Sequence, residues 1–301
     1  MIRYVTHADI DRTAWDALLL RCPGRLWYAR SRVLDRTGPW DALIDEEAGG
    51  IMPLPYRVRW GIPYVYNPYG LQQLGVFALE PSRELAAAFI HAIPRRFRYV
   101  DSWVNADTLA TGVPGRFEPQ MDQTIRCDRD IDTIRSDYSK GHRRNLRKNP
   151  GPAIAEDLSA DDFITLFERT TGAQFGGSPR GSLAPLRSII ADAVNEGTGR
   201  ILCLRADDAP VAAACFITWE GRSILLKSAN ETRGHQAQAM FHLTDRWIAQ
   251  HAGTGTLLDF AGSNTASVAR FNAGFGAAIS TYFRFRLNRL PWPLLHLKPR
   301  S

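Results

Sequence analysis

The fold of this chain is decided by the stretch from Ile201 to Leu287, whose first part, residues 201–251, reads ILCLRADDAPVAAACFITWEGRSILLKSANETRGHQAQAMFHLTDRWIAQH. Apolar runs at 201–204, 211–219 and 223–228 are separated by turns that contain Asp, Pro and Gly. Such turn residues between runs suited to strands predict an antiparallel β-meander.

The rest of the stretch predicts alternating helices and strands. After a polar loop at 229–236, Met240, Leu243, Trp247 and Ile248 recur at helical intervals and would pack on the sheet. The segments that follow predict a strand, a short helix and a closing strand, at Leu257–Phe260, Ala266–Asn272 and Ile279–Leu287.

This order of elements resembles the GNAT acyltransferase fold. In that family two neighbouring strands splay apart around the pantetheine of CoA, and backbone N–H groups at a helix N-terminus hold its pyrophosphate. The resemblance implies an α/β (α+β) fold with a mixed sheet, and acyl-CoA, acetyl-CoA or longer, as the co-substrate. It also implies two tandem GNAT-like domains, a degenerate one at residues 1–130 and the acyltransferase domain at 131–301.

Two further segments resemble FemAB-like proteins, which are tandem-GNAT enzymes. Residues 138–148, YSKGHRRNLRK, resemble the start of their second domain, and residues 259–264 and 270–277 resemble their Asp-Phe-x-Gly and Phe-Lys-x-x-Phe-Gly signatures. Some members move amino acids from aminoacyl-tRNA onto peptidoglycan precursors, so an aminoacyl-tRNA-dependent ligase is an alternative function. The Lys expected after Phe271 is Asn272 here, which argues against the use of tRNA.

The GNAT resemblance also implies the residues that contact acyl-CoA. Backbone N–H groups near the end of the third meander strand would polarise the acyl carbonyl, and residues 233–239, RGHQAQA, would hold the pyrophosphate. The spacing of this loop departs from the family pattern Gln/Arg-x-x-Gly-x-Gly/Ala, and an ordinary loop before a helix is the alternative. The predicted cofactor-binding residues are Lys227, Ser228, Arg233, Gly234, Gln236, Asn264 and Phe271.

Two residues are predicted to be catalytic. Tyr282, on the last strand, would protonate the leaving thiolate, or it would be a core residue. Asp259, at the end of its strand, would orient the attacking amine or take its proton, or it would cap the turn at Ser263 and Asn264.

The N-terminal part offers candidates for recognition of the acceptor. Residues 52–70 are rich in aromatics and prolines, and their prolines predict an edge strand and loops rather than a central strand. We expect Tyr66, Gln72 and Gln73 to bind the amine acceptor, because aromatic rings and amides suit such contacts. Packing between the domains is the alternative role.

A basic helix is predicted at residues 132–149. Tyr138, His142 and Leu146 mark its buried side by their four-residue spacing. The predicted substrate-binding arginines are Arg143, Arg144 and Arg147, because a guanidinium can bind two phosphate oxygens at once. The hypothesis is that they line an interdomain cleft and bind a phosphate-bearing substrate, and a solvated helix face is the alternative.

Composition limits the remaining classes. The chain has 301 residues, a net charge of +6 and 45% hydrophobic residues, as expected for a globular protein. No apolar run is long enough to cross a membrane, and no signal peptide is recognised, so a cytoplasmic location is expected. The four cysteines form no CxxC or Cys/His cluster, so no metal site and no disulfide framework is predicted. The basic character suits CoA, tRNA, a nucleotide-linked precursor or an anionic lipid surface, whereas no DNA-binding module is recognised.

Three functions are therefore carried forward. The first is an N-acyltransferase that moves an acyl group from acyl-CoA to an amine acceptor in the interdomain cleft. The second is the FemAB-like aminoacyl-tRNA-dependent ligase. The third is a non-catalytic GNAT-like binding module, which bulky side chains filling the space between strands 223–228 and 257–260 would favour.

Overall fold

The computed structural model describes residues 1–148, 153–156, 158–172 and 181–291. Within these residues it divides into two compact units, unit 1 (residues 1–120 and 281–301) and unit 2 (residues 121–280). Both are mixed α/β structures, so the predicted fold class is confirmed. No helix in the described ranges is long and apolar enough to span a membrane.

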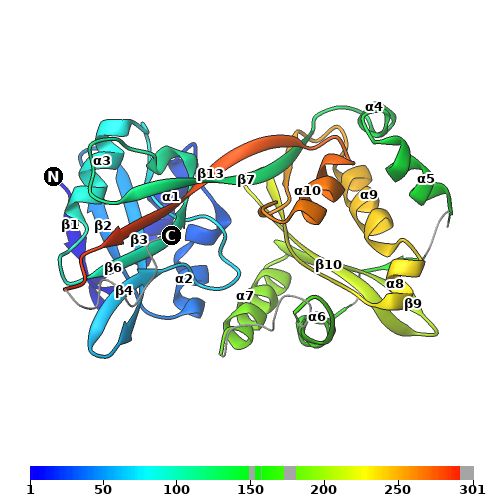
Figure 1. Ribbon diagram of the computed structural model, residues 1–301, viewed down its shortest axis with the longest axis horizontal. Helices are drawn as coiled ribbons and strands as arrows, with labels where there is room; N and C mark the ends of the chain where they lie inside the picture. Colours follow the sequence, from blue (N-terminus) through cyan, green and yellow to red (C-terminus); the bar gives the residue numbers. More distant parts are fainter. Residues whose placement is uncertain (149–152, 157, 173–180, 292–301) are drawn as a thin grey trace. The chain divides into compact units, whose positions relative to one another are not determined.

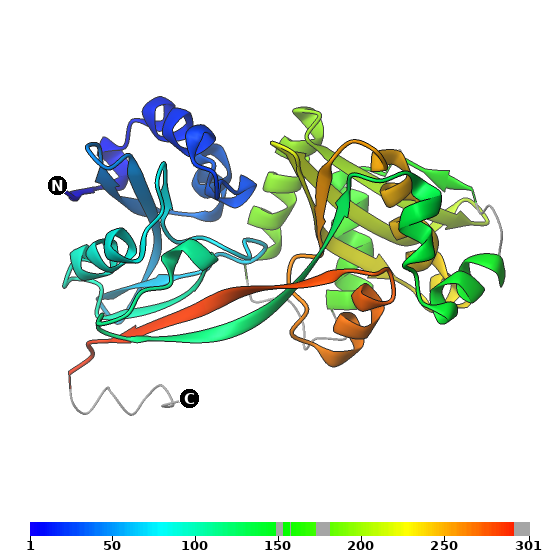
Figure 2. The ribbon, with the colours of Figure 1, turned by 90° about the horizontal axis from the view of Figure 1, so that it is seen from above.

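Unit 1 is built on a sheet with the strand order β1-β2-β3-β4-β6-β13, in which β5 also pairs with β3. Helix α3 lies on one face of this sheet and α1 on the other (Figure 2). Its elements are β1 (Arg3–Val5), α1 (Arg12–Arg21), α2 (Ser31–Thr37), β2 (Trp40–Asp45), β3 (Gly50–Arg59), β4 (Ile62–Tyr66), β5 (Phe77–Ala78), α3 (Arg83–Ala92) and β6 (Tyr99–Val104), with single 3-10 turns at His7–Asp9, Trp27–Ala29 and Ala106–Thr108.

The alternation of side chains along β2 explains these two layers. Leu43 packs with Phe89 and Ile90 of α3, whereas the Trp40 ring meets the Trp15 ring of α1 edge-on, with centroids 4.9 Å apart. The Trp15 indole donates to the backbone oxygen of Ala29 at 2.8 Å, so its one polar atom is satisfied inside the core.

The prediction that the proline-rich segment is an edge strand was wrong, because β3 pairs with β2 and with β4. Pro53 and Pro55 lie in the half that pairs with β2, and the pairing with β4 starts only at Tyr56. Pro53 and Pro55 therefore lie where β3 pairs with β2 but not with β4. Their missing N–H groups interrupt no hydrogen bonds between β3 and β4.

Unit 2 is built on a sheet with the strand order β7-β12-β11-β10-β9-β8. Helices α6 and α7 lie on one face of its strands, and α9 lies on the other (Figure 1). Its elements are β7 (Arg116–Cys127), α4 (Ile131–Ser136), α5 (Lys140–Lys148), β8 (Ile154–Ala155), α6 (Ala160–Phe167), a π-helical turn (Glu168–Gly172), α7 (Leu183–Asn195), β9 (Gly199–Ala206), β10 (Ala209–Trp219), β11 (Arg222–Asn230), α8 (Thr232–Gln236), α9 (Ala239–His251), β12 (Thr256–Asp259), α10 (Ala266–Ala273) and β13 (Ala278–Asn288).

The boundaries of the units differ from the predicted domains 1–130 and 131–301. Strand β13 begins in unit 2, but Phe283–Asn288 pair with Val104–Tyr99 of β6, so the end of the chain belongs to unit 1. Strand β7 likewise begins in unit 1 and ends in unit 2. Sequence patterns report each strand but not its partner, and the partner is what sets these boundaries.

The predicted helix at 132–149 is two helices in the described part of that range, because the chain turns at Asp137–Ser139. The Ser139 hydroxyl accepts from the His142 backbone N–H, which caps α5, and the Ser139 N–H donates to the Gly274 carbonyl. The predicted buried side of this segment is confirmed, because Tyr138 and His142 are buried and Leu146 packs against the core of unit 2.

Candidate functional site

The two parallel strands β11 and β12 pair over only three positions, Arg222–Ile224 with Leu257–Asp259. Beyond Ile224, β11 continues to Asn230 while keeping its pairing with β10, and β12 ends. In the residues that the structure describes, the edge of β11 facing away from β10 then has no further strand partner. We call this divergence the fork. Unpaired strand edges of this kind present backbone donors and acceptors to a ligand.

An irregularity in β11 shapes the fork. Cys215 pairs with Lys227, but the next residue, Phe216, pairs with Leu225, so Leu226 is the extra residue of a β-bulge. Bulges bend a strand and are common beside active sites. Lys227 is half-buried as a residue, and desolvation of its ammonium lowers its pKa to about 8. Its neighbour Ser228 is also half-buried.

Asp259 lies at the base of the fork and is fully buried. Its carboxylate accepts from the Arg222 guanidinium at 2.7 and 2.8 Å and from the Ala261 backbone N–H at 2.7 Å. The contact with Ala261 caps the turn directly after β12, whereas the alternative drawn from the sequence placed the cap at Ser263 and Asn264. Its catalytic role stays a prediction.

A second carboxyl group, Asp122 of β7, completes this cluster, and no sequence pattern pointed to it. Asp122 is buried, and one of its oxygens accepts from the backbone N–H groups of Gln123 and Gly262, both at 2.9 Å. Burial, and then the nearby Asp259 carboxylate, raise the pKa of Asp122 to about 7. The cluster of Asp122, Arg222 and Asp259 thus fixes the strands at the base of the fork to the turn that follows β12.

This pKa predicts a dependence of stability on pH. The unfolded chain releases the Asp122 proton near pH 4, whereas the folded chain retains it until about pH 7. The folded state therefore binds more protons in this window, and its free energy of unfolding should fall by up to about 1.4 kcal/mol per pH unit as the pH rises. Asp122→Asn keeps an acceptor for Gly262 and cannot ionise, so its stability relative to the unmutated protein should increase from pH 5 to pH 8 in urea unfolding. Parallel pH profiles for the two proteins would contradict this prediction.

Side chains of the loop predicted to hold the CoA pyrophosphate, residues 233–239, and of Glu231 just before it make contacts within the protein. Helix α8 has five residues, and the residue before it, Glu231, pairs with Arg169 at 2.6 Å. Arg233 pairs with Asp207 at 2.5 Å. A Cβ atom on Gly234 would lie 2.7 Å from the Val211 carbonyl oxygen, so Gly234 is required for packing against β10. These contacts engage the side chains of the loop, and binding of a CoA pyrophosphate by its backbone N–H groups stays a prediction. Gln236, the last residue of α8, completes this predicted set.

The predicted residues on the other side of the fork, Asn264 and Phe271, also make structural contacts. The Asn264 side-chain oxygen accepts from the Met121 N–H at 2.9 Å. Phe271 of α10 packs against Phe241 of α9, with ring centroids 5.1 Å apart. Asn272, which replaces the expected Lys, is buried and donates to Ser263 at 2.9 Å.

His142 brings α5 into the same aromatic cluster. Its ring lies 4.8 Å from the Phe241 ring and 4.5 Å from the Phe275 ring, and its Nε2 is 2.9 Å from the Phe271 carbonyl oxygen. A Cβ atom on Gly274 would fall within this ring's own volume, so Gly274 is what lets α5 approach. Helix α5 thereby packs against α9 and α10 through His142.

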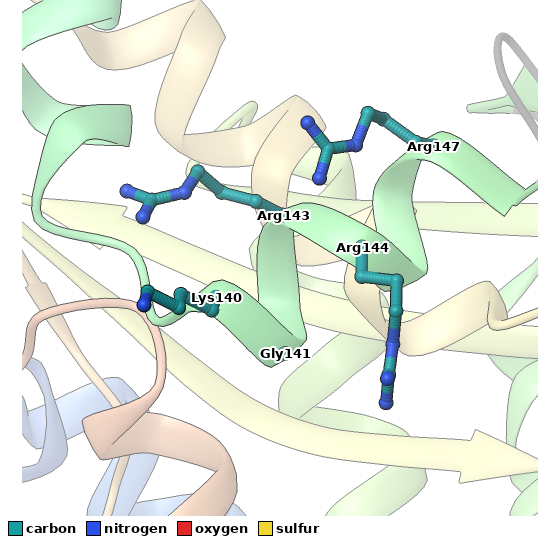
Figure 3. A pocket seen from close by; sticks show the side chains of 5 residues that line it. All are labelled: Lys140, Gly141, Arg143, Arg144 and Arg147. Atoms are coloured by element: carbon teal, nitrogen blue, oxygen red, sulfur yellow. The ribbon is translucent and has the colours of Figure 1, made fainter.

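The exposed side of α5 forms an open pocket of about 540 Å³, lined by Lys140, Gly141, Arg143, Arg144 and Arg147. Lys140 and Arg143 extend to the same side of the helix, and Arg144 points elsewhere (Figure 3). Within the described part of the chain, none of these four cations forms an ion pair, and Arg143 donates to the Ser136 carbonyl at 2.9 Å. The structure thus brings the three predicted substrate-binding arginines into one cationic pocket.

The remaining predicted residues belong to unit 1. Tyr282 is buried on β13 and is assigned to unit 1, whereas Asp259 belongs to unit 2, so no single unit brings these two together. Gln72 and Gln73 are buried, and Gln73 donates to Gln72 at 3.4 Å. The Arg57 guanidinium carbon lies 4.4 Å from the centroid of the Tyr66 ring. Among the described residues, no group of three or more His, Cys, Asp or Glu side chains is placed to hold a metal ion.

Comparisons with known proteins agree with the GNAT fold expected from the order of the elements. Residues 135–266 match the family model described as an acetyltransferase (GNAT) domain. No curated protein matches the chain.

Similar solved structures cover nearly the whole chain. The crystal structure of FemX has a TM-score of 0.67 and 14% identity over 96% of this chain and 98% of that one. The C-terminal domain of a putative lysylphosphatidylglycerol synthetase from Agrobacterium fabrum has a TM-score of 0.61 and 11% identity over 95% and 94%. A tandem GNAT protein from the clavulanic acid biosynthesis pathway has a TM-score of 0.51 and 14% identity over 97% and 99%. The tandem GNAT fold is thereby confirmed.

Proposed function

We propose that this chain, whose residues 135–266 match a GNAT acetyltransferase domain, is an N-acyltransferase that joins an activated acyl group to an amine at the fork. The observation that carries the proposal is the divergence of β11 from β12 after Ile224, beside a β-bulge. A strand edge without a neighbouring strand among the described residues can align an extended acyl carrier and polarise its carbonyl with backbone N–H groups.

The reaction needs little beyond positioning and one proton transfer. The amine nitrogen attacks the acyl carbon, an amide bond forms, and the bond from that carbon to the sulfur or oxygen of the carrier breaks. The proton lost by the amine ends on the leaving group. Asp259 is the predicted proton carrier in unit 2, and Lys227, with a pKa lowered to about 8, is a further candidate beside the fork.

The carrier is proposed to bear phosphate groups, which the pocket on α5 would bind through Lys140, Arg143, Arg144 and Arg147. Acyl-CoA was the carrier expected from the sequence. The loop before α9, in which Glu231 is paired with Arg169, is the other predicted site for its phosphates.

The second candidate function is the aminoacyl-tRNA-dependent ligase that adds an amino acid to a peptidoglycan-type precursor. It is supported by the cationic pocket on α5, which suits the phosphates of a nucleic acid. Asn272 argues against this function only through the resemblance to FemAB-like proteins, in which a Lys is expected at this position. In the structure the buried Asn272 amide donates to Ser263, and Asn272 does not line the pocket on α5.

One experiment separates these donors. The purified protein is titrated by calorimetry with acetyl-CoA and longer acyl-CoAs, and in parallel with charged and uncharged tRNA at low salt, where phosphate contacts are strongest. Transfer to a panel of amines is followed by mass spectrometry with each donor that binds. Saturable binding and amide formation with one donor class supports the corresponding function, and absence of both with every donor overturns the proposal in favour of a binding module.

A matched pair of variants tests the place of the chemistry. Ser228→Trp adds bulk at a half-buried position of β11 within the fork, and Ser188→Trp adds the same bulk at a half-buried position of α7. Transfer should be lost in the first variant and retained in the second. Equal activity in both would show that the acyl group is not bound at the fork.

A further inference from the structure

The turn between β3 and β4 carries a residue that its backbone disfavours. Arg59 pairs with Ile62, so Trp60 and Gly61 form a two-residue hairpin turn, with φ values of +52° and +74°. Turns with two positive φ values prefer Asn, Asp or Gly at the first position. A bulky side chain there is uncommon and costs stability.

The two other tight hairpins of this chain show what the geometry prefers. The β9–β10 turn holds Asp207 and Asp208, at +50° and +61°, and the β10–β11 turn holds Glu220 and Gly221, at +48° and +74°. Both place polar, charged residues in the same conformation. The tryptophan at position 60 is therefore not a requirement of the turn.

The surroundings of Trp60 combine exposed apolar and cationic groups. Trp60 is 73% exposed and Val58 is 60% exposed, and the intervening Arg57 and Arg59 are exposed too. The Arg59 guanidinium lies 4.4 Å from the Trp60 ring centroid. Residues 48–79 contain no Asp or Glu, so no carboxylate on this part of the chain offsets the two arginines. The hairpin extends beyond the other strands of unit 1 (Figure 1, lower left).

We propose that the tip of the β3–β4 hairpin binds the surface of an anionic lipid bilayer. Trp60 and Val58 would enter the headgroup region, where amphipathic indole rings are favoured. Arg57 and Arg59 would contact the lipid phosphates. A protein partner fits less well, because a stable protein interface buries about 800 Å² on each side and two side chains at a tip offer far less. The inference concerns attachment and does not depend on the proposed acyl transfer.

The turn itself supplies the decisive variant. Trp60→Asn places a preferred residue in the turn, so the variant should be at least as stable as the unmutated protein in thermal unfolding. Its sedimentation with vesicles of phosphatidylcholine containing one-third phosphatidylglycerol should weaken at least about tenfold. Arg57→Gln and Arg59→Gln should each weaken it about fivefold, and added salt should weaken it further. Trp103→Thr, which removes a different exposed tryptophan, should bind as before.

A second measurement locates the contact, since a basic protein can also adhere through another surface. Cys22, Cys127, Cys203 and Cys215 are all buried, so a cysteine introduced at the surface can be labelled selectively. A polarity-sensitive dye on Val58→Cys should move to a less polar environment when the phosphatidylglycerol vesicles are added. The same dye on Glu220→Cys, at the tip of another hairpin, should not. The proposal is overturned if the vesicles do not bind, if Trp60→Asn binds like the unmutated protein, or if the dye at position 58 stays in water while the protein sediments.

Discussion

Replacement of Asp259 with Ala is expected to lower the free energy of unfolding by about 3–5 kcal/mol, because it leaves a partly buried guanidinium without its main partner. Asp259 is fully buried, and Arg222 donates two hydrogen bonds to it at the base of the fork. The Ala261 N–H loses its acceptor in the same variant, although Ala261 has a φ of +55° that needs such support. Urea unfolding followed by tryptophan fluorescence measures the effect.

Asp122 determines how much of this loss is observed. Its carboxyl oxygen lies 4.0 Å from the Arg222 guanidinium, so ionisation of Asp122 can supply a replacement partner when Asp259 is absent. The loss from Asp259→Ala should therefore be larger in an Asp122→Asn background, with a coupling energy of about 1–3 kcal/mol between the two sites. Simple additivity of the two changes would contradict the idea of a shared cation.

An exposed ion pair provides the control. Asp161 pairs with Arg187 at 3.3 Å, but its side chain is 75% exposed. Asp161→Ala should change the free energy of unfolding by no more than about 1 kcal/mol, because water screens such pairs. The contrast between the two aspartates would show that burial, and not the ion pair as such, sets the cost at Asp259.

The order of elements in unit 2 could be predicted because it follows from patterns within short segments of the sequence. The apolar runs and tight turns at residues 201–230 became β9, β10 and β11, and the helical spacing of Leu243, Trp247 and Ile248 became the buried face of α9. These features follow from the alternation of side chains over a few neighbouring residues. The fork was predicted only through the resemblance to GNAT proteins, since no local pattern shows where two strands part.

Contacts between segments far apart in the chain could not be predicted from the sequence. Asp122 and Asp259 are 137 positions apart, and nothing in either local pattern places one beside the other. The approach of His142 to Gly274 is of the same kind. For Gly234 the sequence suggested a phosphate loop, and the structure shows a glycine needed for packing on Val211. Both roles require a residue without a side chain, so composition alone does not distinguish them.

Replacement of both Arg143 and Arg144 with Ala is expected to weaken binding of a phosphate-bearing donor by about 1.5–3 kcal/mol for each charged hydrogen bond lost. Each such loss corresponds to a rise in Kd of about tenfold to 150-fold. The expectation rests on the pocket along α5, where these side chains stand with Lys140 and Arg147 and form no ion pair in the described ranges. Binding of CoA by calorimetry and of tRNA by filter retention measures the effect on each type of donor.

Folding should be unaffected by this double change, because the helix is held by its other side. His142 and Leu146 pack against the core, whereas Arg144 is exposed and Arg143 makes only a hydrogen bond to Ser136. The matched control is Arg83→Ala with Arg246→Ala, which removes the same charge from exposed positions of α3 and α9. If the control weakens binding as much as the test variant, the attraction is a property of the net charge of +6. If only the test variant binds weakly and both unfold like the unmutated protein, α5 holds the phosphates of the donor.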